Sequence, residues 1–269
     1  MIKELKKNMV IWSLFDSGNG SYFNTLKDMD NIENFSVGLD RENKNSHFIN
    51  LNLADYSALF GKDNLLEELS KLPKPDLIIA SPPCESWSVA SSMSEGNACW
   101  KQQRHDSLFA PQTPLSKYTI REYKDYTTGQ FKPEKSLMTR INGELTIFNT
   151  IKIIKHFEPT YYVIENPAYG RIWEYIDKIL GFDIPFENLT YYNNYDYPIV
   201  KPTKFGSNIN LNLKKDKVPP EKSFNDIHGY NARSNIPQKL VSYIFETIYK
   251  DWKNNNLEEN IKEIELLNE

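Results

Sequence analysis

The sequence predicts an α/β protein in which a mostly parallel sheet carries helices on both faces. Short apolar runs, typical of buried strands, alternate along the chain with segments whose apolar residues repeat at helical spacing. Strands that alternate with helices in this way favour a parallel sheet. The length of 269 residues fits one large α/β domain, and the content of 39% hydrophobic and 25% charged residues is typical of an ordered globular chain.

The first third of the chain holds four predicted strands and two predicted helices. The strands are expected at 10–15, 35–40, 48–53 and 77–80, and the helices at 21–29 and 65–72. The third strand alternates apolar and polar residues, and four leucines of the second helix recur at helical spacing. The fourth strand is a purely apolar run that ends at two prolines, which indicates a buried strand.

The rest of the chain continues the same pattern after an interruption. A helix is expected at 145–156, a buried strand at 161–164, a hairpin around 195–210 and an amphipathic helix at 237–252. The interruption at 93–143 is polar and has few apolar repeats. Segments of that length inside a compact domain usually have a function or are mobile. The sequence therefore predicts a single domain over 1–269 with an insertion at 93–143.

Composition excludes several classes of protein. No apolar run approaches the ~20 residues that span a bilayer, and no cleavable signal pattern follows the basic N-terminus. The two cysteines, Cys84 and Cys99, are too few for a disulfide framework, and the sequence has neither a CxxC pair nor a histidine cluster for a metal. We therefore expect no metal, no membrane contact and a reducing, cytoplasmic location.

Charge is segregated along the chain although the net charge is only −4. The segment 201–230 contains six lysines, and the stretch after position 257 is strongly acidic. A net negative charge does not indicate a nucleic-acid ligand, but a chain with this net charge can still have a local basic patch. The basic segment is therefore either a solvated surface or a binding surface.

The most informative motif is Ser81-Pro82-Pro83-Cys84, directly after the predicted strand 77–80. Neither proline can donate a ladder hydrogen bond, and each fixes its own φ angle. The motif therefore places a thiol on a stiff turn just past the carboxyl end of a buried strand. Open α/β sheets bind their ligands at that edge. A cysteine alone in such a loop is as readily a buried structural residue.

A glycine turn and two acids follow the first three predicted strands. Gly18 and Gly20 allow the backbone to approach a ligand closely, although the turn is neither a full dinucleotide fingerprint nor a P-loop. Asp40 ends the second strand, where an acid suits a ribose diol, and Asp55 follows the third, where it can read an adenine amino group. Each acid alone is equally explained as a helix cap or turn residue.

Glu165 follows the predicted strand 161–164 directly, so its carboxyl group lies near the sheet core and needs a partner. A cysteine and a glutamate at neighbouring strand ends suit covalent catalysis on an electrophilic ring. The thiolate attacks the ring, and the carboxyl group protonates or holds a ring nitrogen.

These motifs, in this order, resemble those of the DNA cytosine-5 methyltransferase family. The resemblance rests on Phe15 to Gly20, Gly38-Leu39-Asp40, Leu53-Ala54-Asp55, Ser81-Pro82-Pro83-Cys84, Ile164-Glu165-Asn166-Pro167 and Asn231 to Pro237. The Pro-Pro-Cys and Glu-Asn motifs are its most specific parts. The resemblance implies a Rossmann-like fold, S-adenosylmethionine as the methyl donor, and duplex DNA with a flipped-out target cytosine as the substrate. The Asn- and Lys-rich composition is compatible with an AT-rich bacterial or phage genome, and a cognate restriction endonuclease is a candidate partner.

The resemblance further implies a role for individual residues. Cys84 is the expected nucleophile towards C6 of cytosine, Glu165 the group that engages N3 and the amine, and Lys204 the cation beside them. The expected cofactor residues are Phe15, Asp16, Gly18, Gly20, Asp40, Asp55, Pro82 and Asn235. The expected substrate contacts are Ser81, Pro83, Asn166, Lys201, Arg104 and Arg121. The motif from Asn231 to Pro237, which contains Asn235, belongs to the C-terminal helical segment expected at 231–252. This segment is expected to fold back onto the cofactor site. Phe15 either stacks on adenine or belongs to the core.

Three features depart from the family pattern. Glu85 stands where the family usually has glutamine, and an anion beside a thiol raises the pKa of that thiol. Lys201 and Lys204 stand where arginines are expected, and lysine supplies charge without a bidentate fork. The third departure is that 205–230 is too short for a target-recognition domain.

The missing recognition domain leaves the substrate contact open. The insertion at 93–143 is a candidate, with Arg140, Lys101 and Lys124 as further phosphate partners and Trp100 or Tyr118 as stacking groups; otherwise it is a surface loop. Two other functions also remain open. One is a pyrimidine C5 methyltransferase that acts on RNA or a nucleotide, and the other is a catalytically weak protein of the same fold that binds DNA or a partner.

Overall fold

The computed structural model describes residues 8–17, 20–39, 46–102, 118–126, 129, 131–223, 226 and 235–267. Seven strands form one sheet in the order β10-β11-β9-β4-β1-β2-β3. The strands are β1 (Met9–Leu14), β2 (Ile32–Gly38), β3 (Phe48–Asn50), β4 (Leu77–Ala80), β9 (Tyr161–Pro167), β10 (Phe186–Tyr191) and β11 (Pro202–Ser207). Neighbouring strands from β3 through β9 run parallel, whereas β11 is antiparallel to both β9 and β10.

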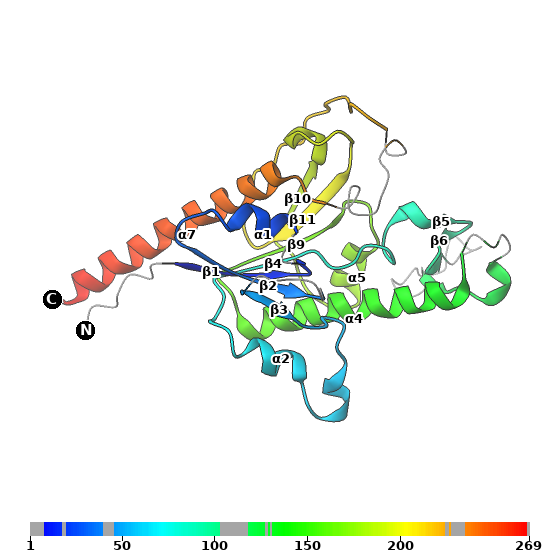
Figure 1. Cartoon of the computed structure of the whole chain (residues 1–269), viewed down its shortest axis with the longest axis horizontal. Helices are drawn as coiled ribbons and strands as arrows, with labels where there is room; N and C mark the ends of the chain where they lie inside the picture. Colours follow the sequence, from blue (N-terminus) through cyan, green and yellow to red (C-terminus); the bar gives the residue numbers. More distant parts are fainter. Residues whose placement is uncertain are drawn as a thin grey trace, which may run out of the picture.

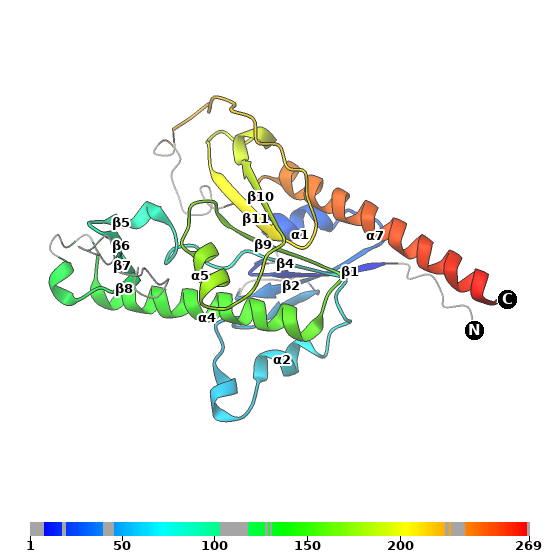
Figure 2. The same cartoon turned by 180° about the vertical axis from the view of Figure 1, so that it is seen from behind.

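Helices cover both faces of this sheet, as predicted (Figures 1 and 2). The helices are α1 (Ser21–Leu26), α2 (Asn64–Leu69), α4 (Pro133–Phe157), α5 (Ile172–Lys178) and α7 (Gln238–Leu267). Helices α1 and α7 lie on one face, and α2, α4 and α5 lie on the other (Figure 1). No helix in the described ranges is both long and apolar enough to cross a membrane.

The sheet is buried on both faces because alternate side chains of its central strands enter two separate cores. Ile11 of β1 and Val163 of β9 pack with α1 and α7, whereas Trp12 of β1 and Ile164 of β9 pack with α2, α4 and α5. Side chains alternate between the faces of a strand, so a purely apolar run such as Leu77–Ala80 serves both cores. Burial of this kind stabilises by about 25 cal/mol per Å² of apolar surface.

The predicted elements all occur, with shifted ends. Helix α4 begins at Pro133, well before the predicted 145, because its first turns lie beside the insertion. The predicted hairpin is formed by β10 and β11, joined by η4 (Tyr192–Tyr195). The last helix continues past the predicted 252 to Leu267, and Trp252 near its middle is still buried against the sheet.

Part of the insertion folds as a second, small sheet. Its strands are β5 (Ser92–Met93), β6 (Gly96–Asn97), β7 (Trp100–Gln102) and β8 (Tyr118–Ile120), paired in sequence order. This sheet lies beyond the carboxyl ends of β1 and β4, next to the start of α4 (Figure 1). The insertion is therefore ordered structure at the ligand-binding edge of the main sheet, over the residues that the structure describes.

Candidate active site

The Ser-Pro-Pro-Cys turn and Glu165 lie at the ends of two neighbouring strands. Strand β4 pairs in parallel with β9, and Ala80 aligns with Ile164. Ser81 and Glu165 are the next residues on their strands, so they come side by side. The Ser81 hydroxyl is near enough to the Glu165 carboxyl group to lower its pKa. The structure thus brings the predicted nucleophile turn and the predicted acid together.

Hydrogen bonds to the backbone hold the turn that carries Cys84. The side-chain amide of Asn166 donates to the Pro82 carbonyl (2.9 Å), and the backbone N–H groups of Trp87 and Ser88 donate to the Cys84 carbonyl (3.0 and 2.8 Å). Pro82 is buried, and Cys84 and Pro83 are half-buried. Asn166 is fully buried, and its Oδ1 makes no hydrogen bond within the part of the chain that the structure describes. The turn is therefore a fixed platform for the thiol.

The environment of Cys84 favours the neutral thiol. Burial raises its pKa to about 11, and the negative charges of Glu85 and Glu165 add to the rise while Lys201 opposes it. A thiolate is the nucleophilic form, so the thiol needs activation before it can attack. The sequence predicts that Glu85 raises the pKa of the Cys84 thiol, and the structure gives the same direction. Burial raises this pKa more than Glu85 does.

Glu165 sits at the centre of a buried hydrogen-bond network. Tyr192 of η4 donates its hydroxyl proton to Oε1 of Glu165 (3.1 Å), and Ser81 Oγ lies 2.5 Å from the hydroxyl of Tyr22 on α1. Burial raises the pKa of Glu165, whereas Lys201, Tyr192 and Ser81 lower it. A carboxyl group held in this way keeps its proton to a higher pH than an exposed glutamate does.

The two lysines of the β11 region lie on opposite faces of the sheet. The Lys201 ammonium lies 4.7 Å from the centre of the Tyr192 ring and acts electrostatically on Glu165. The Lys204 ammonium pairs with Glu187 (2.9 Å) and lies 5.0 Å from the centre of the Trp173 ring. The structure therefore brings Lys201, rather than the predicted Lys204, to the Cys84–Glu165 pair.

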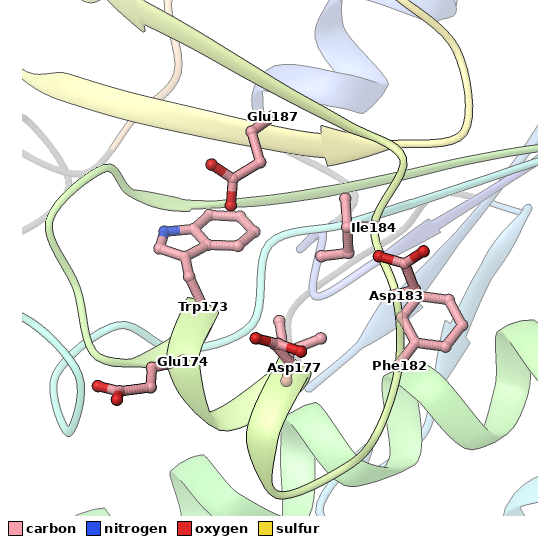
Figure 3. Close-up of a pocket in the computed structure, with 8 residues that line it drawn as sticks. Trp173, Glu174, Asp177, Phe182, Asp183, Ile184 and Glu187 are labelled. Carbon is pink, nitrogen blue, oxygen red and sulfur yellow. The ribbon is translucent and has the colours of Figure 1, made fainter. Parts of the chain in front are cut away.

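Strand register explains where Lys204 lies. Lys204 pairs with Asn166, and its neighbour Phe205 pairs with Glu165, so Phe205 shares the face of Glu165 and Lys204 takes the other. On that other face, Trp173 and Glu187 line a hollow of about 360 Å³ beside α5, together with Glu174, Asp177 and Asp183 (Figure 3). Four carboxylates make this hollow unsuitable for a phosphate group.

The residues that follow β1 form a tight corner against β2 and α1. Asp16 is buried, and its Oδ2 accepts hydrogen bonds from Ser36 Oγ (2.8 Å) and from the backbone N–H of Phe23 (3.1 Å). A Cβ atom on Gly20 would lie only 2.0 Å from Oδ1 of Asp16, which explains the glycine. Asp16, predicted as a cofactor ligand, is thus committed to holding this corner together.

Phe15 occupies a backbone conformation that residues other than glycine rarely adopt. Its φ angle is +65°, in the left-handed region. Its ring is half-buried and packs against the core on the α4 side. The ring therefore has a core contact and an exposed part. Backbone strain of this kind costs about 1–3 kcal/mol and clusters at functional sites.

Asp55 holds the turn that leads into η1 (Ser57–Phe60), and its predicted contact with adenine stays a prediction. Its Oδ1 accepts hydrogen bonds from the backbone N–H (2.9 Å) and the hydroxyl of Ser57. It is half-buried after β3, where Asn149 of α4 donates to the carbonyls of Leu53 and Asp55. The predicted site residues Gly18, Asp40 and Arg104 lie outside the described residues.

Asn235 meets the glycine turn across a hollow of about 350 Å³, a volume within the range of small-molecule pockets. The hollow is lined by Gly20, Ser21 and Asn24 at the start of α1, by Tyr195, Asp196 and Tyr197, and by Asn235 to Lys239 at the start of α7. Asn235 and the first residues of α7 therefore lie across this hollow from Gly20, and the cofactor contact expected of Asn235 stays a prediction. Exposed amides, hydroxyls and a carboxylate at this edge of the sheet fit the polar amino-acid end of S-adenosylmethionine.

Four of the described basic side chains at 93–143 contact other parts of the insertion, whereas Lys132 and Lys135 are exposed. Arg121 is buried, and its guanidinium donates to the carbonyls of Asn97 (2.5 Å) and Ser94 (2.7 Å). The Arg140 guanidinium lies 5.2 Å from the centre of the Trp100 ring, and that ring stacks on Trp87. Burial and these two hydrogen bonds tie Arg121 to the insertion, and its predicted contact with the substrate stays a prediction.

Further basic residues of the insertion are also paired. Lys101 pairs with Asp125 (2.9 Å), and the exposed Lys124 pairs with Glu122 (2.5 Å). In the part of the chain that the structure describes, no cluster of His, Cys, Asp or Glu side chains is arranged to hold a metal ion.

Sequence reasoning missed Tyr22 and Tyr192. Both tyrosines are almost completely buried, and both contribute hydroxyl groups to the network around Glu165. Tyr22 follows the glycine turn on α1, and Tyr192 lies in a tyrosine-rich stretch before the lysine motif. No spacing or motif separates them from the other fourteen tyrosines, since the chain has sixteen in all.

The order and direction of the strands define the class of fold. Read from β3, parallel strands run through β2, β1, β4 and β9, and the antiparallel β11 is inserted between β9 and β10. This is a Rossmann-like fold, a mostly parallel sheet with helices on both faces. The ligand-binding edge of such a sheet is the carboxyl end of its parallel strands, where Cys84, Glu165 and the glycine turn lie.

Two solved structures share part of this architecture. One is described as a DNA modification methyltransferase encoded within a prophage (E. coli), with 12% sequence identity, a TM-score of 0.40 and coverage of 79% of this chain. The other is the Dnmt2 methyltransferase of S. pombe, with 14% identity, a TM-score of 0.41 and coverage of 82%. This chain spans about half the length of each, 52% and 53%. The sequence matches no protein-family model and no curated protein. The fold assignment therefore rests on strand order and direction.

Proposed function

We propose that this protein transfers a methyl group from S-adenosylmethionine to C5 of cytosine in DNA. The observation that carries the proposal is the position of the Cys84 turn beside Glu165 at the ends of two paired parallel strands. Few other reactions need a thiol and a buried carboxyl group side by side at the ligand edge of this fold. The protein is then a cytoplasmic enzyme of a bacterium or a phage.

The mechanism follows from the chemistry of the two groups. The Cys84 thiolate adds to C6 of the flipped cytosine while Glu165 gives a proton to N3. The electron pair moved to C5 makes that carbon nucleophilic, so it accepts the methyl group. Loss of the C5 proton to a base and departure of the Cys84 thiolate restore the aromatic ring. The N3 proton returns to Glu165, and the thiolate regains from solvent the proton that Cys84 gave up before the attack, which leaves both residues as they began.

The surroundings of Glu165 suit the proton that it handles. Its raised pKa keeps the proton on the carboxyl group to a higher pH than an exposed glutamate would, and the hydrogen bond from Tyr192 holds the carboxyl group in place. Lys201 supplies positive charge next to Glu165 and favours the negative charge that develops on the ring and the sulfur. We therefore assign Lys201 the role that the sequence gave to Lys204.

The cofactor would be held at the carboxyl ends of β1 and β3 and by the start of α7. Gly20, Asn24 and Asn235 would contact its amino-acid end, and Phe15 and Asp55 its adenosine end. When bound there, S-adenosylmethionine supplies an electrophilic methyl group. The buried Asn166 Oδ1, which has no hydrogen-bond donor in the described part of the chain, would be free to accept one from the ligand or the turn.

A radiolabel experiment tests this function. The purified protein is incubated with S-adenosylmethionine carrying a tritiated methyl group and with duplex DNA of mixed sequence, single-stranded RNA or cytidine nucleotide. We expect label in 5-methylcytosine from DNA, and none with Cys84→Ser. Label in RNA alone would mean that the substrate is RNA and not DNA. Label on the cytosine amine would overturn the C5 mechanism.

The raised pKa of Cys84 favours one second candidate function, a protein of this fold that binds DNA but transfers methyl groups weakly. In that case, wild type and Cys84→Ser bind DNA equally and neither incorporates label above background. The two candidates therefore predict different results in one experiment.

A further inference from the structure

A segment after β11 presents exposed lysines on a fixed backbone. We call residues 214–222 the lysine strap. It contains Lys214, Lys215, Lys217 and Lys222 against Asp216 and Glu221, and all six side chains are exposed. Figure 1 shows this part of the chain arching past β10 and β11 at the edge of the sheet. A charge run of this kind is often only a solvated surface, so its attachment to the fold matters.

Buried residues anchor the beginning of the strap. Leu211 and Leu213 lie in the core beneath α1 and α7. The Thr190 hydroxyl donates to the Lys214 carbonyl (2.5 Å), and the Lys214 N–H donates to the Tyr195 hydroxyl (2.8 Å). The lysines therefore start from a fixed point on the hairpin formed by β10 and β11.

Two asparagines and a carbonyl fix the rest of the strap. Asn194 makes two hydrogen bonds with the backbone of Asp216, and Asn193 donates to the Val218 carbonyl (2.6 Å). The N–H groups of Glu221 and Lys222 both donate to the Pro198 carbonyl (3.0 and 2.9 Å). A backbone with these contacts holds its lysines at set positions, which lowers the entropy that binding would cost.

The anchors belong to the same short element as the candidate active site. Asn193 and Asn194 lie in η4, whose first residue, Tyr192, donates to Glu165. Because Thr203 at the start of β11 pairs with Pro167 at the end of β9, η4 and its following loop lie at the carboxyl edge of the sheet. The strap is therefore attached at the rim of the candidate active site. It runs alongside the loop that carries Lys201.

We propose that the lysine strap binds the phosphate backbone of the nucleic-acid substrate next to the target base. The proposal rests on the proposed function for the identity of the ligand. The alternatives on this edge are weaker, because Arg121 and Lys101 of the insertion are engaged internally and the hollow beside α5 is acidic. Phosphate contacts of this type supply affinity without reading sequence.

The test is the salt dependence of DNA binding. The variant Lys214→Ala/Lys215→Ala/Lys217→Ala/Lys222→Ala is compared with Lys27→Ala/Lys62→Ala/Lys71→Ala/Lys74→Ala, which removes four exposed lysines elsewhere. Affinity for a fluorescein-labelled 24-base-pair duplex is measured by fluorescence anisotropy from about 50 to 300 mM NaCl. Each lost phosphate contact lowers the salt slope by about 0.9. We expect the strap variant to bind at least about tenfold more weakly at 100 mM NaCl, with a slope smaller by about 2 to 4.

Equal affinity and equal slope in the two variants would overturn the proposal. Unchanged thermal unfolding of both variants ensures that lost binding is not lost folding. The outcome is separable from that of the proposed function, because binding is measured without a methyl donor. If wild type transfers no methyl group but the strap variant still loses salt-dependent affinity, the strap proposal stands and the C5 assignment fails. Single-stranded RNA of the same length in a parallel titration shows which nucleic acid the strap prefers.

Discussion

At the scale of single residues, the Cys84 thiol lies on a half-buried turn, with Glu85 exposed to solvent directly after it. Its pKa of about 11 means that roughly one thiol in a thousand is ionised at pH 8. Substrate binding must therefore change this environment before attack. An incoming pyrimidine, a closer Lys201 ammonium and the removal of water each alter the balance between thiol and thiolate.

The alkylation rate of Cys84 measures the pKa of this thiol directly. In a Cys99→Ser background, the rate of reaction with iodoacetamide should rise about tenfold per pH unit from pH 7 to 10 without a plateau, because the pKa lies near 11. Glu85→Gln removes one negative charge and lowers the pKa, so alkylation at pH 8 should be about threefold faster. Glu85→Asp is the matched control that keeps the charge. A plateau below pH 9 in the Glu85-containing protein would contradict the burial account.

The Tyr192 hydroxyl should lower the pKa of Glu165. Tyr192→Phe removes a hydrogen bond that lowers the pKa of Glu165, so that pKa rises further and the protonated form persists to higher pH. If methyl transfer requires protonated Glu165, the fall of activity at high pH should move upward, while the rate at the optimum drops by about tenfold or more because the carboxyl group is held less firmly. Tyr243→Phe, which loses a hydroxyl bonded to the Asn212 carbonyl, is the control and should leave the pH profile unchanged. An unshifted profile in Tyr192→Phe would remove Tyr192 from the account.

Residue roles could be predicted only for residues that follow a recognisable strand in the sequence. Cys84 and Glu165 follow apolar runs that stop at prolines or polar residues, so their common edge was visible in the sequence. The face that Lys204 takes depends on the antiparallel register of β11 against β9, which no local pattern reveals. Tyr192 reaches Glu165 from η4, and that contact depends on the path of the hairpin.

At the scale of elements, helix α4 links the insertion to the catalytic turn. Gly143 of α4 is buried, and a Cβ atom there would lie 2.0 Å from Ser86 Oγ and 3.2 Å from Trp87 Nε1. Ser86 and Trp87 lie two and three residues after Cys84 and are fully buried. The helix therefore needs a glycine here so that it can approach the turn that carries the nucleophile.

The substitution Gly143→Ala should disturb this approach. Overpacking costs about 1–3 kcal/mol, which offsets the gain of about 1 kcal/mol that alanine brings to a helix. We expect a stability change between about 0 and −2 kcal/mol in urea unfolding and a loss of methyl transfer of at least about tenfold. Asn142→Ala on the exposed side of the same helix is the control, and Ser86→Ala combined with Gly143→Ala should recover part of the activity. Full activity in Gly143→Ala would mean that the contact does not position Cys84.

The elements themselves were largely predictable, but the insertion was not. Apolar runs and helical repeats mark the strands and helices of the main sheet because these elements bury continuous apolar faces. Strands β5 to β8 are only two or three residues long and are held by Arg121 and Asn97 instead of an apolar face. Periodicity cannot detect such strands, so basic residues that hold the insertion together looked like phosphate ligands.

At the scale of the whole molecule, the fold gathers motifs from distant parts of the chain at one edge of the sheet. The turns after β1, β3 and β4, the end of β9, η4 and the segment before α7 all meet there. Parallel strands place every carboxyl end on the same edge, which is why a series of strand-end motifs could indicate a site. The lysine strap adds a basic surface at the rim of this edge.

Trapping on DNA that carries 5-fluorocytosine tests the central claim most directly. Fluorine at C5 cannot leave as a proton does, so an enzyme that attacks C6 stays covalently attached after methyl transfer. The account predicts a denaturation-resistant protein–DNA complex that requires both Cys84 and S-adenosylmethionine and is absent with Cys84→Ser. A folded wild-type protein that forms no such complex on any of a varied set of sequences, or a complex that persists in Cys84→Ser, would contradict it.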